Sequence, residues 1–217
     1  MAGGLSSRMG LDKIFADIGD RTVIESTISA FLECNSVNDI IVVINEKSLQ
    51  KIEELVSNIN GKEKIRICIG GESRRDSVAN GLEAMSKKSE YVAIHDGARP
   101  WIRPSQIEKV YESAMQYGAA VSARPITDTV KRCDPEGAIT ESISRKDLWA
   151  METPQIFSTE LIKRAYVQAN LENQQVTDEV SAIELIGEPV RVVHDPFKNP
   201  KITFPDDLKA KDPMQST

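Results

Sequence analysis

The feature that most limits the fold is a regular alternation of short apolar runs with stretches of helical periodicity. Residues 39–44 (Asp-Ile-Ile-Val-Val-Ile) form a β-branched run that is typical of a strand buried on both faces of a parallel sheet. Residues 91–94 predict another buried strand, and residues 104–117 carry apolar side chains at helical spacing. Strands that alternate with helices indicate βαβ units, so we expect an α/β fold with a doubly wound, mainly parallel sheet.

The remaining elements continue this alternation. Helices are expected over residues 22–34, 46–59, 158–173 and 178–186, and strands over residues 64–69, 119–123 and 189–193. A further helix follows Gly70-Gly71, with Ser73 as its N-cap and Asp76 in the capping-box position, and Thr177 is expected to cap the helix that begins at residue 178. A chain of 217 residues with 40% hydrophobic residues can bury one core, so we expect a single domain over residues 1–217.

The alternation breaks after Pro125. Residues 128–133 and 138–144 predict two strands around the turn Asp134-Pro135-Glu136-Gly137. A two-stranded hairpin is marginal on its own, so we expect this arm, residues 126–146, to lean on another part of the assembly, and a second subunit is a good candidate. Trp149, just beyond the arm, is expected to be a core or interface anchor.

The opening stretch, residues 1–13, combines small residues with two cations. Its glycines and serines allow a ligand to approach the backbone closely, and Arg8 and Lys13 add positive charge, which suits a polyphosphate. The glycine spacing matches neither a Walker A loop nor a dinucleotide fingerprint, and an ordinary surface turn is an alternative. A phosphate loop of this type should follow the first strand of the sheet, yet nothing precedes Ala2 except Met1, so the first strand is apparently missing.

Composition excludes several classes of function. The net charge of −6 does not predict nucleic-acid binding, and a cationic pocket against that background favours a small anionic ligand. We expect no membrane span and no signal peptide, because no apolar run approaches ~20 residues. Cys34, Cys68 and Cys133 lie far apart without a CxxC pair, which indicates reduced thiols in a cytoplasmic protein. The chain has 2 histidines, which excludes a multi-histidine metal site.

Several motifs, in order over nearly the whole chain, carry a resemblance to a known family. They are Ala2-Gly3-Gly4…Arg8-Met9…Lys13, Gly70-Gly71-Glu72-Ser73-Arg74-Arg75-Asp76-Ser77-Val78, His95-Asp96-Gly97-Ala98-Arg99-Pro100, Asp128-Thr129-Val130-Lys131, Arg145…Leu148-Trp149…Thr153-Pro154-Gln155…Phe157, Thr177-Asp178-Glu179 and Lys201-Ile202-Thr203…Pro205…Asp207-Leu208. On these motifs the chain resembles the 2-C-methyl-D-erythritol 4-phosphate cytidylyltransferases of the non-mevalonate isoprenoid pathway. The resemblance implies a Rossmann-like nucleotidyltransferase fold.

The implied reaction is the attack of a substrate phosphate on the α-phosphorus of CTP, with release of pyrophosphate. A phosphate monoester is already anionic at neutral pH, so the reaction needs positioning and charge neutralisation rather than a general base. The resemblance gives catalytic roles to four cations, two for the triphosphate and two for the attacking phosphate: Arg8 and Lys13, then Arg145 and Lys201.

The resemblance also implies the binding residues. Nucleotide contacts fall on Ala2, Gly3, Gly4, Gly71, Glu72, Ser77, Asp96 and Gly97, and further substrate contacts on Arg99, Thr129, Thr153 and Thr177. Asp96 is also the tentative ligand for Mg²⁺, since a single carboxylate suits a metal that takes its other ligands from phosphates and water; the alternative is a carboxylate that caps the following turn. The implied assembly is a homodimer in which the arm reaches across, so that each active site mixes residues of both chains.

Three alternatives remain. A ribitol-5-phosphate cytidylyltransferase would keep much of the motif set, although residues 128–131 and 145–149 favour the erythritol enzyme. The opening loop, with Arg8 and Lys13 close together, is also similar to that of molybdenum-cofactor guanylyltransferases, which offer no match to the ending at Lys201. The third alternative is a dimeric relative that has lost its chemistry, against which the retained cations and glycines argue.

Overall fold

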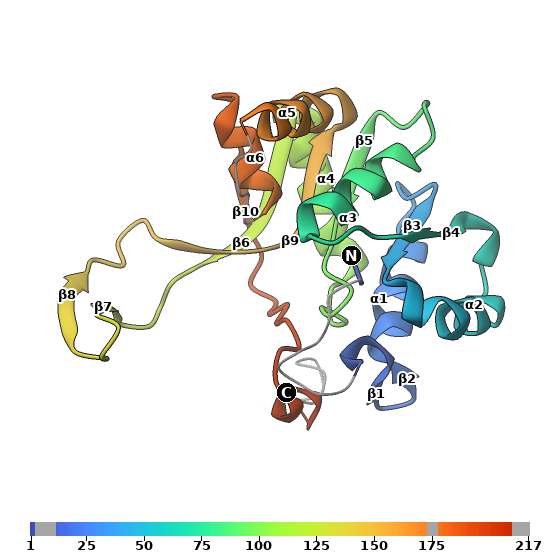
Figure 1. The fold of residues 1–217 in the computed structure, drawn as a ribbon, viewed down its shortest axis with the longest axis horizontal. Helices are drawn as coiled ribbons and strands as arrows, with labels where there is room; N and C mark the ends of the chain where they lie inside the picture. The colour runs from blue at the N-terminus through green and yellow to red at the C-terminus, as the bar shows by residue number, and fades with distance from the viewer. Residues whose placement is uncertain (3–11, 173–177, 210–217) are drawn as a thin grey trace.

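The computed structural model describes residues 1–2, 12–172 and 178–209. Its strands form two groups, four strands in the order β10 (Arg191–His194), β6 (Ala119–Pro125), β9 (Trp149–Ser158) and β5 (Tyr91–Ile94), and a pair, β3 (Ile40–Ile44) with β4 (Ile65–Ile69). β10 is parallel to β6 and β3 to β4, whereas β9 is antiparallel to both of its neighbours. β5, β6 and β10 therefore share one direction, and the predicted mainly parallel α/β fold is confirmed (Figure 1).

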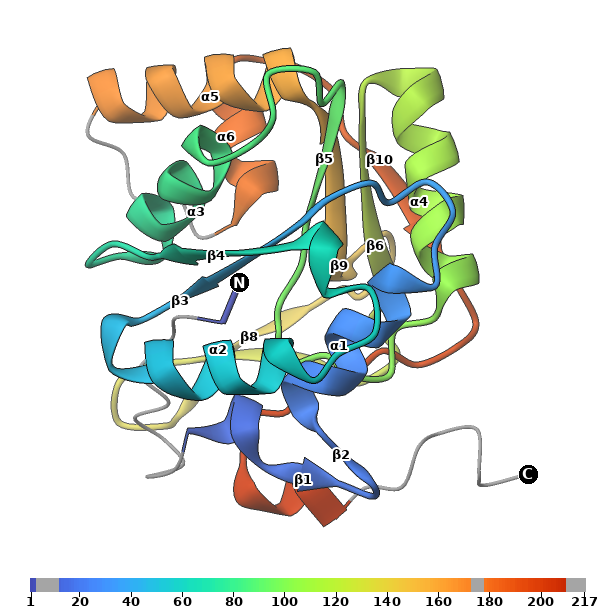
Figure 2. The ribbon, with the colours of Figure 1, turned by 90° about the vertical axis from the view of Figure 1, so that its right-hand side faces the viewer.

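Helices cover both faces of these strands. α3 (Arg74–Glu83), α5 (Thr159–Leu171) and α6 (Glu179–Leu185) pack around Phe157 in one core. Ile156, the preceding residue on β9, points to the opposite face, where α4 (Pro104–Tyr117) packs on it. α1 (Val23–Leu32) and α2 (Leu49–Ser57) cover β3 and β4 (Figure 2). The chain is therefore doubly wound, as the alternation of strands and helices predicts.

Local sequence explains where these helices begin and end. α3 begins with the expected capping box, in which Ser73 and Asp76 exchange hydrogen bonds. α4 has Pro104 in its first turn and ends at Gly118, whose φ of 84° is a left-handed conformation that glycine adopts without strain. The N-cap of α6 is Asp178, whose side chain accepts a hydrogen bond from the backbone N–H of Ser181. The prediction of Thr177 as this cap is wrong, because the Asp178 side chain occupies the capping position.

β9 is the element that the sequence pattern does not reveal. Residues 152–157 read Glu-Thr-Pro-Gln-Ile-Phe, a polar run with a proline, which normally argues against an interior strand. All six of these residues are nevertheless buried. Burial is tolerated because the polar side chains find partners; Gln155 Nε2, for example, donates to Asp178 Oδ2 over 3.1 Å. Hydrogen bonds to residues distant in sequence therefore stabilise this strand, and the local sequence pattern does not predict them.

Short elements complete the described chain. They are the strand pair β1 (Asp17–Ile18) and β2 (Arg21–Thr22), and the 3₁₀ turns η1 (Lys13–Phe15), η2 (Glu46–Ser48), η3 (Lys62–Lys64) and η4 (Pro205–Lys209). No helix in the described ranges combines the length and the apolar character that a membrane crossing requires.

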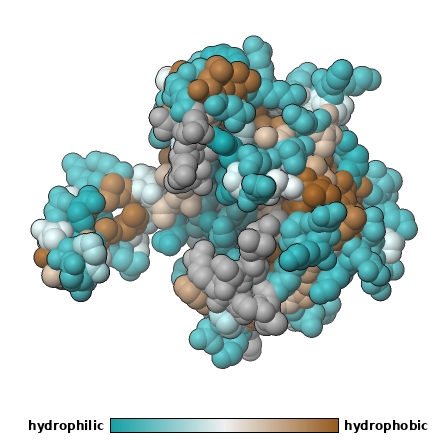
Figure 3. All heavy atoms as spheres, in the orientation of Figure 1, coloured by the Kyte–Doolittle hydropathy of each residue, from teal (hydrophilic) through white to brown (hydrophobic). Residues whose placement is uncertain are grey.

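The arm stands clear of the body. β7 (Val130–Cys133) and β8 (Ile139–Ile143) pair antiparallel with each other and, among the described residues, with no further strand (Figure 1). Apolar side chains remain on its surface and near its base, including Ile139 at 66% exposure (Figure 3). The hairpin agrees with the two strands expected from sequence. Trp149 is 37% exposed and packs edge-on against His194, so it is not a core anchor of this chain.

β3 and β5 are less buried than their composition predicts. Ile40 and Ile41 are half-buried and Ala93 is exposed, although both strands were expected to be buried throughout. These residues are exposed because β3 and β5 belong to different strand groups and do not pair with each other. Among the described residues, only the Met1–Ala2 segment connects β3 to the loop after β5 by backbone hydrogen bonds.

Candidate active site

The Met1–Ala2 segment ties the carboxyl ends of two strands together. The Met1 amine donates to His95 O over 2.6 Å, and Gly97 N donates to Met1 O over 2.8 Å. On the other side, Ala2 N donates to Val43 O over 2.8 Å. The opening loop therefore departs from the carboxyl edge of the strands, which is where open α/β sheets bind ligands.

Gly97 leaves room for this close approach. A Cβ at Gly97 would lie 3.1 Å from Ile24 Cδ1 and 3.2 Å from Met1 O. Thr27 Oγ1 donates to Gly97 O over 3.1 Å, which fixes the loop against α1. The predicted nucleotide-binding residues Ala2 and Gly97 are thus neighbours at one edge of the sheet.

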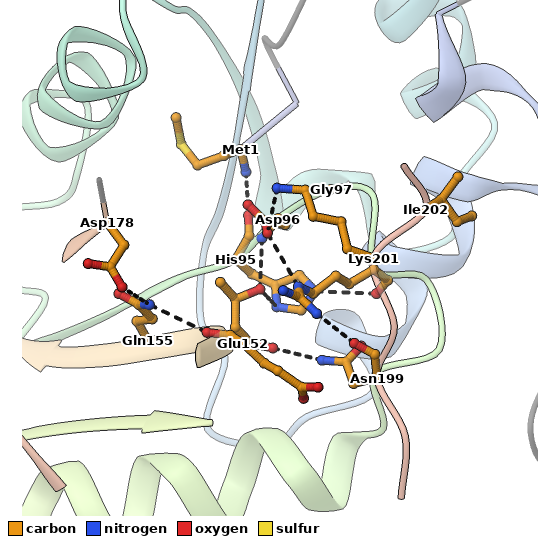
Figure 4. Close-up of polar contacts among 12 residues, drawn as sticks. Met1, His95, Asp96, Gly97, Glu152, Gln155, Asp178, Asn199, Lys201 and Ile202 are labelled. Atoms are coloured by element: carbon orange, nitrogen blue, oxygen red, sulfur yellow. Dashed lines mark hydrogen bonds and ion pairs between the residues drawn. The ribbon is translucent and has the colours of Figure 1, made fainter. Parts of the chain in front are cut away.

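Asp96 is the centre of the site (Figure 4). Its Oδ2 atom lies 3.0 Å from Lys201 Nζ and 3.3 Å from Arg99 Nε. The Asp96 and Arg99 side chains are 13% and 11% exposed, whereas Lys201 is 43% exposed. Burial alone would raise the pKa of Asp96, but Lys201 and Arg99 outweigh that effect and hold the pKa well below its usual range. The carboxylate therefore stays ionised and holds two cations in place.

Buried polar residues support this cluster from behind. Asn199 O accepts from Arg99 Nη1 over 2.7 Å, and Asn199 Nδ2 donates to Thr153 O over 2.7 Å. The Thr153 hydroxyl accepts from Asp96 N over 3.0 Å and lies 3.0 Å from His95 Nδ1. Thr153, a predicted substrate contact, thus joins β9 to the loop after β5 through its hydroxyl.

Lys13 reaches the same site from the end of the opening stretch. Its Nζ donates to Ile202 O over 2.9 Å, directly beside Lys201. Lys13, Arg99 and Lys201 are therefore brought together from segments that lie far apart in sequence. Two cations paired with one carboxylate leave an excess of positive charge, which suits phosphate ligands.

The start of α3 forms a glycine-dependent loop. Gly71 N donates to Ser77 Oγ over 3.1 Å, and a Cβ at Gly71 would lie 2.3 Å from Asp76 Cβ, so only glycine fits there. Ser77 is buried, and Glu72 is exposed next to the helix N-terminus. Backbone N–H groups at a helix N-terminus favour anionic ligands, which agrees with the predicted nucleotide-binding role of this segment.

Arg74 and Glu179 form an ion pair that was not predicted from the sequence; the Glu179 side chain is fully buried and the Arg74 side chain is 35% exposed. Arg74 Nη1 and Nη2 lie 2.5 and 2.8 Å from the two Glu179 carboxylate oxygens, and Tyr166 Oη donates to the same carboxylate over 3.2 Å. Burial opposes the charge on Arg74, but Glu179 outweighs it and raises the pKa of the guanidinium. The pair fixes α6 against the start of α3. The sequence offers one indication that the two residues matter: each lies in one of the family motifs, residues 70–78 and residues 177–179.

Two predicted residues lie away from this cluster. Arg145 and Thr129 are exposed at the base of the arm, where the Arg145 guanidinium contacts Thr127 O. Four further predictions, Gly3, Gly4, Arg8 and Thr177, lie outside the described residues. Within one chain the structure therefore gathers Ala2, Lys13, Asp96, Gly97, Arg99, Thr153 and Lys201.

The described residues contain no group of three or more His, Cys, Asp and Glu side chains that could hold a metal ion. A mainly parallel, doubly wound sheet with cations at the carboxyl ends of its strands, together with a glycine-dependent helix start, suits the binding of a nucleotide at that edge. The family model for 2-C-methyl-D-erythritol 4-phosphate cytidylyltransferase matches residues 1–214. The chain belongs to this family, and the resemblance drawn from its motifs is confirmed.

Comparisons with individual relatives agree with this family assignment. The chain is 40% identical to the 2-C-methyl-D-erythritol 4-phosphate cytidylyltransferase of Dehalococcoides mccartyi, over 96% of this chain and 90% of the relative. Its structure is similar to 4-diphosphocytidyl-2C-methyl-D-erythritol synthase from Anaerococcus prevotii, with a TM-score of 0.83, 28% identity and coverage of 93% and 88% of the two chains. It is also similar to 2-C-methyl-D-erythritol 4-phosphate cytidylyltransferase from Thermus thermophilus, with a TM-score of 0.79, 28% identity and 94% coverage of both chains.

The buried histidine gives a pH-dependent stability that can be measured. Burial lowers the pKa of His95 from its ordinary 6.5 to about 3, so below pH 6.5 the unfolded chain binds a proton that the folded chain does not. The free energy of unfolding therefore falls as the pH falls through this window, by up to about 1.4 kcal/mol per pH unit from this residue. Urea unfolding between pH 7 and pH 5 should show a shallower fall for His95→Gln.

The matched control is His194→Gln, at an exposed position on β10. It should keep the pH dependence of the unsubstituted protein. An unchanged slope in His95→Gln would show that the buried imidazole does not control acid stability.

Proposed function

We propose that the chain transfers a cytidylyl group from CTP to 2-C-methyl-D-erythritol 4-phosphate and releases pyrophosphate. The product is 4-diphosphocytidyl-2-C-methylerythritol, a precursor in non-mevalonate isoprenoid synthesis. The observation that carries the proposal is the pairing of Arg99 and Lys201 with Asp96, beside Lys13 on the backbone oxygen of Ile202, in a member of this family.

The proposed chemistry is a displacement at phosphorus. An oxygen of the sugar-alcohol phosphate forms a bond to the α-phosphorus of CTP, and the bond from that phosphorus to the bridging oxygen of the β-phosphate breaks. Pyrophosphate leaves with the electron pair. The nucleophile has a second pKa near ~6 and is already anionic at neutral pH, so no residue needs to remove a proton. His95 agrees with this, since it is buried and its pKa is lowered to about 3.

Different cations neutralise the charge of the triphosphate and of the attacking phosphate. Arg8 and Lys13 bind the triphosphate and stabilise the charge that grows on the transferring phosphoryl group. Lys201, held by Asp96, positions the attacking phosphate together with Arg145 and Arg99. Arg145 can grip phosphate oxygens with two N–H donors, whereas Lys201 acts as a point charge. Thr129, Thr153 and Thr177 add the remaining substrate contacts.

The nucleotide lies over the start of α3 and the opening loop. Ala2, Gly3 and Gly4 contact phosphate and base through their backbone, while Gly71, Glu72 and Ser77 contact the cytidine, with Asp96 and Gly97 closing the site. Gly71 supports this arrangement because its lack of a side chain leaves the backbone open beside Ser77. The Arg74–Glu179 pair holds the loop in place.

Mg²⁺ is the proposed cofactor, and Asp96 is the residue that would hold it. Both ion pairs of Asp96 are formed by Oδ2, and a single carboxylate oxygen is a sufficient protein ligand for a metal that arrives on a triphosphate. When bound, the metal neutralises phosphate charge.

Three free thiols, at Cys34, Cys68 and Cys133, support a reducing compartment, and we place the reaction in the cytoplasm.

We further propose a homodimer in which the arm of one chain completes the site of the other. We also propose that residues 1–217 form a single domain, with the arm, residues 126–146, as a part of it. The β7 and β8 strands of the arm project from the body (Figure 1). Its exposed Ile139, together with Trp149 and Met151 near its base, offers apolar surface for a second copy. Arg145 and Thr129 lie on this arm, so an active site that uses them with Lys201 takes them from the partner.

A substrate panel tests the function directly. Pyrophosphate release is measured with CTP or GTP, each with 2-C-methyl-D-erythritol 4-phosphate or ribitol 5-phosphate. We expect turnover with CTP and the methylerythritol substrate, exceeding the other pairs by about a hundredfold or more. Lys201→Met should lower kcat/KM by roughly a hundred- to a thousandfold, because it removes one charge at the site.

Lys209→Met is the matched control, since Lys209 pairs with Asp206 on an exposed turn outside the cluster. Turnover with GTP alone would identify a guanylyltransferase, and a preference for ribitol 5-phosphate would identify the other cytidylyltransferase. Absence of turnover with every pair would favour the inactive relative.

Mixing two inactive variants tests the shared site. Arg145→Ala removes the arm cation and Lys201→Ala removes the body cation, so a mixed dimer holds one intact and one doubly damaged site. Subunit exchange should restore roughly a quarter of the unsubstituted activity at equal amounts, since half of the dimers are mixed. Each variant exchanged with itself is the control. No recovery in exchanged dimers would contradict a site built across two chains.

A further inference from the structure

The His95 imidazole is buried within the loop that carries the charged residues of the site. His95 is 7% exposed and directly follows β5, and its ring packs against that of Phe31 on α1 with 4.9 Å between the centroids. It lies in the Asp96 cluster, yet it takes no part in the proposed displacement at phosphorus (Figure 4). A buried imidazole needs a partner for each of its two nitrogens, and these partners indicate what the residue does.

The Nε2 atom of His95 closes this loop. It lies 3.3 Å from Arg99 O, the carbonyl oxygen four residues further along the chain. A carbonyl oxygen can only accept a hydrogen bond, so Nε2 must carry the proton of this contact. The loop of residues 95–99, which includes Asp96, therefore wraps around the imidazole.

The contact with Arg99 O also determines the tautomer of the ring. Burial opposes the imidazolium form, so the ring is neutral and has a single N–H. Because that N–H is at Nε2, Nδ1 is a bare acceptor. The opposite tautomer would place a lone pair of Nε2 against the lone pairs of the carbonyl oxygen.

The bare Nδ1 atom takes the proton of the Thr153 hydroxyl. Nδ1 lies 3.0 Å from Thr153 Oγ1, and Thr153 is 4% exposed. A hydroxyl has one proton to donate, and here that proton is directed at His95. The same oxygen accepts from Asp96 N over 3.0 Å. Every proton is therefore assigned from Arg99 O, through His95 and Thr153, to the N–H of Asp96.

This chain of hydrogen bonds fixes the backbone beneath an ion pair. It begins at the carbonyl group of Arg99 and ends at the N–H of Asp96, and the side chains of these two residues pair over 3.3 Å. Thr153 belongs to β9, which lies between β6 and β5, so the loop is attached to an interior strand of the sheet. Without Nδ1 as its acceptor, the Thr153 hydroxyl could turn, and its proton would then compete with the N–H of Asp96.

We propose that His95 is a positioning residue for the transfer reaction, which acts through the Thr153 hydroxyl on Asp96. Asp96 in turn holds Lys201. The inference rests on the proposed function, because cytidylyl transfer is the activity that His95 would support. Neither amide residue can replace both ring nitrogens. Asn reaches the position of Nδ1 and can still accept from Thr153, whereas Gln reaches the position of Nε2 and can donate only to Arg99 O.

The tautomer of His95 gives a test that does not depend on catalysis. NMR correlations between the ring protons and ring nitrogens are recorded on protein with isotope-labelled histidine at about pH 8, where an ordinary imidazole is neutral. His95 should show a protonated Nε2 and a bare Nδ1. The chain has 2 histidines, so His194→Gln assigns the signals, and the exposed His194 should show both tautomers in exchange. A protonated Nδ1, or exchange between tautomers at His95, would overturn the proposal.

Substitutions test whether this contact serves the reaction. With CTP, 2-C-methyl-D-erythritol 4-phosphate and saturating Mg²⁺, His95→Gln should lower kcat/KM about tenfold or more, because the Thr153 hydroxyl loses its acceptor. His95→Asn restores an acceptor and should retain at least about threefold more activity than His95→Gln. Thr153→Val removes the hydroxyl, and in that background His95→Gln should cost less than about a further threefold.

Thr159→Val is the matched control. The Thr159 hydroxyl oxygen is buried at the start of α5 and has no hydrogen-bond partner among the described residues. The substitution should leave kcat/KM unchanged. The Tm of each variant shows whether it is folded, and where one does not fold, the tautomer in the unsubstituted protein remains the deciding measurement.

Three kinetic results would overturn the proposal. Full activity in His95→Gln would show that the reaction does not need the imidazole. Equal activity of the Asn and Gln variants would show that the acceptor facing Thr153 is not the contact that matters. Losses in His95→Gln and Thr153→Val that multiply would give the two residues independent roles. Absence of turnover by the unsubstituted chain would instead be a failure of the proposed function, which the substrate panel detects beforehand.

Discussion

The ionised carboxylate of Asp96 is the interaction on which the site depends. It lies just after β5, is largely buried, and holds Lys201 at 3.0 Å and Arg99 at 3.3 Å. A buried carboxylate is unstable without cations, and those cations would repel one another without it. The chain therefore assembles a cationic surface for phosphates in a protein whose net charge is −6.

The rest of the fold brings this cluster together. β9 lies between β5 and β6 and carries Thr153, whose hydroxyl accepts from Asp96 N. The buried Asn199 holds the segment before Lys201 against both Arg99 and β9. Lys13 then reaches the next residue, Ile202, through its backbone carbonyl. Segments separated by 46 to 189 residues thus meet through hydrogen bonds to backbone groups, which tolerate little displacement.

Sequence periodicity predicts the fold well wherever burial alone decides the structure. α4 is found at the residues expected, and the capping box at Ser73 is present. β9 escapes prediction because its polar residues are buried through distant partners such as Asp178. The partial exposure of β3 and β5 escapes it too, since a strand can be buried only if its neighbours are in place, and local composition carries no information about them.

For the site, the sequence predicts which residues take part but not which of them contact one another. Lys13, Asp96, Arg99 and Lys201 were expected from the family motifs, and the structure brings them together. Their pairing could not be predicted, because it depends on which strand ends meet. The Arg74–Glu179 pair lies in two of the motifs, but the contact joins residues 105 positions apart and has no local signal.

The central claim is that Asp96 acts by holding Lys201. A double-mutant cycle tests it most directly, with kcat/KM measured for Asp96→Asn, for Lys201→Met and for both together, at saturating Mg²⁺. If Asp96 positions Lys201, the double variant should lose little more than the worse single variant, with a coupling of about 1 kcal/mol or more. Losses that simply multiply would contradict this account and would give the two residues independent roles.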